Sequence, residues 1–143
     1  MTKAYLQFTR RELFFRIMLL GVPYYLWLYA IGIELSRALP EHQRTHPLVF
    51  KVLAGYPLVY IPAFFFCVIS EAVSFQFIWP FHLAAMASTF LLFVWVSRTV
   101  VQFQKAFNVK SSTTFRLFLA FWYWPIGVWW LQPRLNKYSK LLG

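Results

Sequence analysis

The sequence predicts an all-α integral membrane protein, a bundle of about four hydrophobic helices in one membrane domain (1–143). Apolar residue types make up 60% of the chain and charged types only 13%, against about 25% charged residues in soluble domains. A soluble globule of this size has too little interior to hide so much apolar surface. Four windows lack Asp, Glu, Lys and Arg, namely 17–33, 52–70, 72–97 and 117–133. They approach the length of about 20 apolar residues that crosses a bilayer.

The first helix is expected over about 10–39. Thr9 and Glu12 have the spacing of a capping box, and Pro40 stops the helix. Pro23 lies near its middle and predicts a kink or break. No convincing cleavage site follows the apolar run, so we expect this segment to be kept as an anchor.

The second helix is expected over about 47–69 and the third over about 80–105, with a proline in the first turn of each. Small residues gather near the start of the third helix, a composition that lets helices approach closely in lipid. Ala84, Ala85 and Ser88 are therefore the predicted helix-packing residues. The third helix is the expected packing centre.

The fourth helix is expected over about 112–132, interrupted by Pro125 and Gly127 and ended by Pro133. Pro125 has no N–H group, so it leaves a carbonyl near Phe121 without its helical donor. Gln102 or Gln104 is the expected replacement donor.

The distribution of Lys and Arg leaves two topologies open. If all four helices cross, the 14 basic residues divide equally between the two sides, and the positive-inside rule gives no orientation. If only helices two and three cross, while helices one and four enter and return, all 14 lie on one side. Four crossings is the more ordinary arrangement, because proline is tolerated in spanning helices.

The net charge of +10 comes from residues at the ends of apolar runs. Anionic lipid headgroups lie at those ends, so we expect lipids as partners and no nucleic acid. Trp and Tyr favour the same interface. The predicted interfacial anchors are Trp79, Trp129, Trp130, Arg134 and Lys137.

No catalytic constellation, cofactor motif or metal-ligand spacing is found. His42 and His46 have an i, i+4 spacing, but Pro40 and Pro47 bracket them and disfavour the regular helix that a metal site there needs. His82 is the only ionisable side chain deep in an apolar window. Such a residue is a functional hypothesis by default, either as a haem ligand, a proton relay or a polar contact.

Residues 124–136 carry an aromatic-Pro-Ile-Gly-x-aromatic segment followed by Gln-Pro-Arg-x-Asn. This segment resembles the ending of many small, uncharacterised bacterial inner-membrane proteins. The resemblance covers about the last quarter of the chain. It implies a multi-pass protein of the bacterial cytoplasmic membrane, and it implies no activity.

Three functions remain open at this point. The favoured one is a non-catalytic small subunit, scaffold or assembly factor of a membrane complex, with other membrane subunits or further copies of itself as partners. The alternative is a homo-oligomeric pore, channel or membrane-disrupting effector, for which Ser88, Thr89, Ser97, Gln102 and Gln104 offer a thin polar stripe. The third is a re-entrant lipid enzyme or transporter that uses His82 or Glu71.

Overall fold

The computed structural model of the chain describes residues 21–70 and 73–141, and these residues are helical with no strand among them. The all-α class is confirmed for this part of the chain. The elements are α3 (Val22–Ala38), the short 3-10 helix η1 (Glu41–Gln43), α4 (Pro47–Ser70), α5 (Phe75–Ala106), α6 (Thr114–Trp122) and α7 (Trp124–Leu141).

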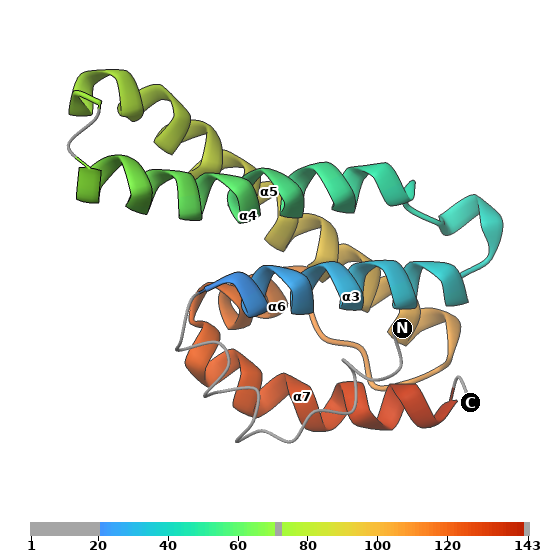
Figure 1. Cartoon of the computed structure of the whole chain (residues 1–143). Helices are drawn as coiled ribbons and strands as arrows, with labels where there is room; N and C mark the ends of the chain where they lie inside the picture. The colour runs from blue at the N-terminus through green and yellow to red at the C-terminus, as the bar shows by residue number, and fades with distance from the viewer. Residues whose placement is uncertain (1–20, 71–72, 142–143) are drawn as a thin grey trace.

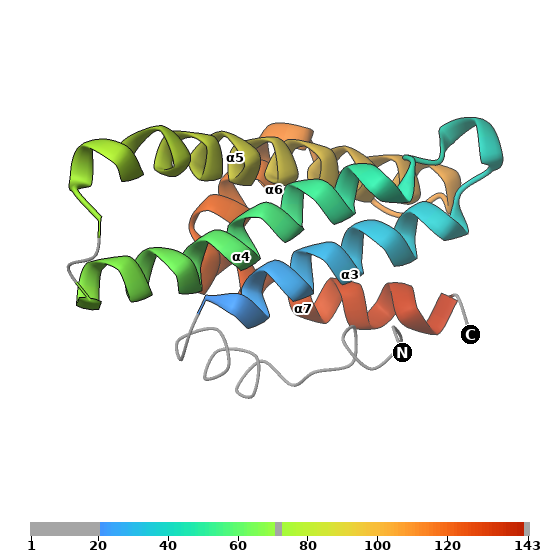
Figure 2. The ribbon, with the colours of Figure 1, turned by 45° about the horizontal axis from the view of Figure 1, so that its top comes forward.

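The helices α4 and α5 form a long hairpin whose closed end projects beyond the other helices (Figures 1 and 2). α3 lies along both, and α5 also packs against α6, which packs against α7. Large side chains from four of these helices fill the core where they meet, and Trp27, Phe50, Phe103 and Phe121 are fully buried there.

Two helical stretches, Glu41–Phe64 and Gln76–Ala106, are long and apolar enough to cross a membrane. Only 17% and 22% of their most apolar windows are buried inside the described structure. The core helix of a soluble protein would be mostly buried instead. These two helices therefore present most of their apolar surface outward.

The first described helix begins later than the sequence predicts. Gly21 adopts a left-handed backbone conformation with φ 66°, and α3 starts at the next residue. Pro23 consequently lies in the first turn, where its missing N–H group would have had no helical partner anyway. A regular helix over 10–39 is therefore broken at Gly21, two residues before Pro23, in agreement with the predicted kink or break. The remainder of the expected helix, with the Thr9–Glu12 capping box, lies outside the described residues.

Several prolines lie inside helices where the sequence predicts a helix boundary or an interruption. α5 begins at Phe75 and contains Pro80, so the expected start at residue 80 is wrong. The carbonyl that loses its donor to Pro80 belongs to Gln76, an exposed residue near the helix end. α4 likewise runs through Pro57 and Pro62.

The predicted end at Gln132 is also wrong, because α7 continues through Pro133 to Leu141. Three side chains on one face of α7 explain this continuation. Leu131, Leu135 and Tyr138 are buried at i, i+4 and i+7, on both sides of the proline. Their burial stabilises the helix across the one missing hydrogen bond.

The expected fourth helix breaks at Tyr123, and the chain turns back there. A Cβ atom on Gly127 would lie 1.6 Å from the carbonyl oxygen of Ala120. Residues seven apart in one continuous helix are about 10 Å apart along the axis, so this contact requires a reversal. Arg116 and Trp130 also line one cavity from α6 and α7. α6 and α7 therefore form a tight helical hairpin.

The carbonyl at the end of α6 accepts a hydrogen bond, as expected, but the donor belongs to α3 and not to α5. The Tyr24 hydroxyl of α3 donates a buried hydrogen bond to the Phe121 carbonyl. The prediction of Gln102 or Gln104 as donor is wrong, since Gln104 bonds Tyr138 and Ser112 instead. A second hydrogen bond joins α3 to α7: Trp27 Nε1 donates to Gln132 Oε1 at 3.0 Å.

We predict that Gly127→Ala separates α6 from α7. The added methyl group would meet backbone atoms of Ala120, which cannot move aside as a side chain can, so we expect a loss of about 3 kcal/mol. The matched control is Gly55→Ala in α4, where a Cβ meets nothing within 4 Å and helix propensity predicts a gain of up to about 1 kcal/mol. Unfolding in detergent micelles measures both; equal stability of the two variants would contradict the close contact.

Candidate functional site

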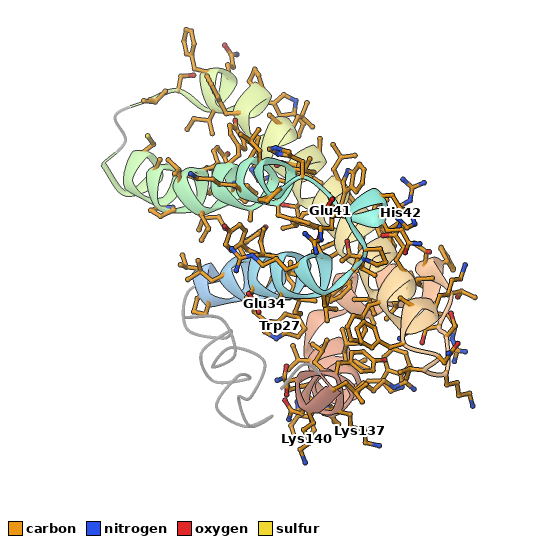
Figure 3. All side chains as sticks on the ribbon, turned by 90° about the vertical axis from the view of Figure 1, so that its right-hand side faces the viewer. Trp27, Glu34, Glu41, His42, Lys137 and Lys140 are labelled. Carbon is orange, nitrogen blue, oxygen red and sulfur yellow. The ribbon has the colours of Figure 1, made fainter. Side chains whose placement is uncertain are left out.

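Basic side chains gather at one end of the helices. α3, α5 and α7 end on the same side of the molecule (Figure 1), and Arg37, Lys105 and Lys140 lie in their last turns. Cations are favourable there, because helix C-termini carry partial negative charge. Figure 3 looks onto this end, with Lys137 and Lys140 on α7 and Glu41 and His42 in the turn after α3.

The opposite end, which is the projecting part of the α4–α5 hairpin, has a different surface. No Lys or Arg occurs between Lys51 and Arg98. Large apolar side chains are exposed there, namely Val59, Phe77, Trp79, Phe81, Leu83, Met86 and Leu91. Exposed apolar side chains of this number are typical of surfaces that contact a membrane or a partner.

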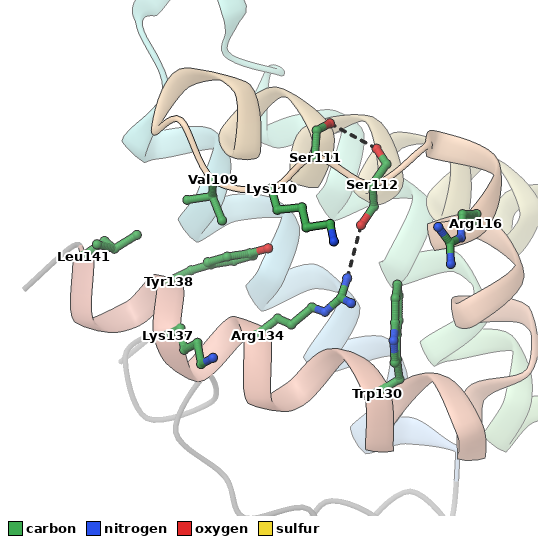
Figure 4. A pocket seen from close by; sticks show the side chains of 10 residues that line it. All are labelled: Val109, Lys110, Ser111, Ser112, Arg116, Trp130, Arg134, Lys137, Tyr138 and Leu141. Carbon is green, nitrogen blue, oxygen red and sulfur yellow. Dashed lines mark hydrogen bonds between the residues drawn. The ribbon is translucent and has the colours of Figure 1, made fainter.

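A cavity of about 480 Å³ lies at the basic end, between α7, the start of α6 and the loop that joins α5 to α6 (Figure 4). We call it the cationic pocket. Four basic side chains line it, and its described lining contains no carboxylate or histidine. The lining residues are Val109, Lys110, Ser111, Ser112, Arg116, Trp130, Arg134, Lys137, Tyr138 and Leu141.

Gln104 of α5 fastens the loop of the pocket to α7. Its side chain is fully buried; Nε2 donates to the Tyr138 hydroxyl at 2.8 Å, and Oε1 accepts from the Ser112 backbone N–H at 2.6 Å. A buried amide is stable only when hydrogen-bonded. This one residue therefore fixes the loop against the helix.

Arg134 is held in place from two directions (Figure 4). Its Nη1 donates to Ser112 Oγ at 3.2 Å, and its guanidinium lies 3.8 Å from the centre of the Trp130 ring, a cation–π contact. The side chains of Lys110, Arg116 and Lys137 have no hydrogen-bond or ion-pair partner among the described residues. The one ion pair in that part of the chain is Arg37 with Glu34, at 3.2 Å.

A second cavity of about 360 Å³ shares two lining residues, Arg116 and Trp130, with the cationic pocket. It runs along the α6–α7 hairpin toward the turn at Tyr123. Its walls are mainly apolar, formed by Leu119, Ala120, Tyr123, Ile126 and Gly127. We call it the apolar groove.

The predicted packing residues divide between two faces of α5. Ala85 and Ser88 are buried, and Ser88 Oγ donates to the Leu53 carbonyl of α4 at 2.9 Å. Ala84 is exposed. The small residues thus serve the α4–α5 contact on one face and remain uncovered on another.

His82 makes a polar contact within the hairpin. Its Nδ1 lies 3.0 Å from the Tyr60 hydroxyl, and the rings of Tyr60, Phe64 and Trp79 surround it. No group of three or more His, Cys, Asp or Glu side chains that could hold a metal occurs in residues 21–70 and 73–141. Glu71 lies outside the described residues.

The predicted anchors are spread over both ends. Trp79 is exposed on the projecting part of the hairpin, and Trp129 is exposed on α7. Trp130, Arg134 and Lys137 line the cationic pocket. Sequence reasoning missed Lys110, Arg116 and Gln104 as parts of the same site, because only the reversal at Tyr123 brings them to α7.

No known protein family, curated protein or solved structure matches this chain. The resemblance of residues 124–136 to small bacterial inner-membrane proteins therefore stays a prediction.

We predict that Gln104→Leu destabilises the protein by about 2–3 kcal/mol, because the Tyr138 hydroxyl loses its donor and the Ser112 N–H loses its acceptor. Gln102→Leu is the matched control, since Gln102 is half-buried and makes no hydrogen bond within the described residues. It should change stability by less than about 0.5 kcal/mol. Chemical unfolding in detergent compares the two; equal losses would contradict the role of Gln104.

Proposed function

We propose that this protein is a non-catalytic membrane protein that acts as a small subunit, scaffold or assembly factor of a membrane complex. In this proposal α4 and α5 cross the bilayer, while α6 and α7 enter from the basic side and return to it. The observation that carries the proposal is the separation of positive charge along the helices: basic residues gather at one end, and the apolar hairpin at the other end has no Lys or Arg between Lys51 and Arg98.

Helix lengths support two crossings by the hairpin. From Trp79 to Arg98 on α5, 19 residues rise about 29 Å, close to the ~30 Å of a hydrocarbon core. Trp and Arg are the residue types that favour the two interfaces. Arg98 also lies 5.8 Å from the Trp95 ring, so aromatic and basic groups meet at the same depth.

The length of α6 argues against a third or fourth crossing by the C-terminal part. Thr114–Trp122 has nine residues and reaches only about 13 Å, less than half of the core. α7 then returns along α6. In this arrangement the ten Lys and Arg residues within 21–70 and 73–141 lie on one side, as the positive-inside rule favours.

The exposed face of α5 supports protein partners within the membrane. Leu83, Ala84, Met86 and Leu91 are uncovered there, and small residues permit close helix approach in lipid. Lipids with anionic headgroups are the proposed partners at the basic end. The resemblance of residues 124–136 supports a bacterial inner-membrane location.

No structural observation favours the pore alternative. Ser88 bonds Leu53, Thr89 bonds Ala85 and contacts Tyr25, and Gln104 bonds Tyr138 and Ser112. Ser97 is fully buried. Four of the five side chains of the predicted stripe thus face the protein's own helices, and Gln102, half-buried, is the remaining one within the described residues.

We predict that cysteines at Pro40, Lys110 and Lys140 react from one side of the membrane and a cysteine at Ser74 from the other. The expected pattern follows from two crossings by α4 and α5. Each single cysteine is introduced in a Cys67→Ser background and labelled with a membrane-impermeant thiol reagent in sealed vesicles. Labelling after detergent lysis is the control for accessibility.

Labelling of residues 40 and 140 from opposite sides would contradict the re-entrant arrangement and favour four crossings. Failure of the chain to stay in the membrane after alkaline extraction would contradict the membrane assignment itself. Native mass measurement after mild detergent extraction tests the function, and a closed ring of identical copies would favour a pore over a subunit.

A further inference from the structure

We propose that the cationic pocket and the apolar groove together bind one lipid with a phosphomonoester headgroup, of the phosphatidic acid type. The phosphate would occupy the pocket and one acyl chain the groove. This inference rests on the proposed function, because only a membrane location brings such a lipid to α6 and α7.

The charge of the pocket calls for an anion with more than one negative charge. Four cations line it, and Lys110, Arg116 and Lys137 have no partner among the described residues. Unpaired like charges repel each other, and a bound anion relieves that repulsion. A phosphate monoester carries between one and two negative charges near neutral pH, and it has three terminal oxygens to accept hydrogen bonds.

The geometry of Arg134 suits a phosphate. Stacking on Trp130 and the bond from Nη1 to Ser112 fix the plane of the guanidinium. Arg has five N–H donors, so several remain for a ligand, and their fork matches two oxygens of one phosphate. The side chain is thus oriented before any ligand arrives.

The apolar groove favours a lipid over a free phosphate. It begins at Arg116 and Trp130, the residues that it shares with the cationic pocket, and continues between Leu119 and Ile126. From Arg134 to Ile126 the helix rises about 12 Å. In the proposed orientation this is the direction from the headgroup region toward the bilayer centre, along which an acyl chain runs.

A monoester should be preferred to a phosphodiester such as phosphatidylglycerol, which carries one charge. The second ionisation of a phosphate monoester has a pKa near 6, and surrounding cations favour the doubly charged form. The titratable or charged side chains facing the ligand are Lys110, Arg116, Arg134, Lys137 and Tyr138. None is a histidine, the side chain that ordinarily changes charge between pH 5 and 8. Binding should therefore strengthen from pH 6 to pH 8 through the ligand.

The test is a titration of the purified full chain in neutral detergent, followed by native mass spectrometry. The probes are phosphatidic acid, phosphatidylglycerol with the same acyl chains, and inorganic phosphate. At pH 8 we expect one phosphatidic acid to bind about tenfold more tightly than phosphatidylglycerol, and inorganic phosphate more weakly than either. At pH 6, where about half of the monoester is doubly charged, the preference should shrink to about fivefold.

Two double variants that remove the same amount of charge distinguish binding in the pocket from nonspecific electrostatic attraction of the lipid to the protein. Lys110→Gln with Lys137→Gln removes two exposed pocket cations and should weaken phosphatidic acid binding about 25-fold, since each lysine near a headgroup contributes about fivefold. Lys51→Gln with Lys105→Gln removes two exposed cations outside the pocket and should change binding less than about threefold. All four side chains are exposed, so neither variant disturbs the core.

Equal binding of the two lipids, or equal losses in the two double variants, would overturn the proposal in favour of diffuse electrostatic attraction. Inorganic phosphate binding as tightly as the lipid would overturn the role of the groove. Each of these results leaves the labelling pattern of the cysteine variants unchanged, so a failure here is distinct from a failure of the proposed membrane arrangement.

Discussion

The close contact between Gly127 and the Ala120 carbonyl determines where the last third of the chain goes. Only a residue without a Cβ fits against that carbonyl, and the contact allows α7 to run back along α6. The basic C-terminal segment consequently returns to the end from which α6 started. Without the reversal, Arg116 and Arg134 would be about 27 Å apart on one helix. With it, they line the same cavity.

The turn between α6 and α7 leaves backbone carbonyl groups without a helical donor. A side chain of α3 supplies a donor to one of them. An unpaired carbonyl in an apolar environment is costly, and the Tyr24 hydroxyl reaches the one at Phe121. Trp27 then bonds Gln132 on the returning helix. Tyr24, Trp27 and Phe121 also contact each other through their rings. The same cluster of side chains therefore fastens α3 to both arms of the α6–α7 hairpin.

The sequence predicts those features that depend on composition and length, and misses those that depend on tertiary packing. α4 and α5 follow from long apolar windows, and the ends of α4 and the end of α5 differ from expectation by no more than one residue. Pro80 and Pro133 misled the prediction, because the local cost of a proline, about 3 kcal/mol, is exceeded where buried side chains such as Leu131 and Leu135 hold the helix on both sides. Trp130, Arg134 and Lys137 were predicted as one interfacial group. Lys110 and Arg116 could not be assigned to it, since no spacing along the chain indicates the reversal.

The described lining of the cationic pocket contains no carboxylate to pair with its four cations. Arg37 at the same end of the molecule has a carboxylate partner in Glu34, whereas the four cations of the pocket have none in its described lining. The Trp130 ring lines the same pocket, and the apolar groove shares Arg116 and Trp130 with it. A partner that offers negative charge next to a hydrocarbon chain satisfies both surfaces at once, and a lipid is the molecule with that arrangement. The pocket and the groove are therefore better explained as two halves of one amphiphilic site than as two separate irregularities of the surface.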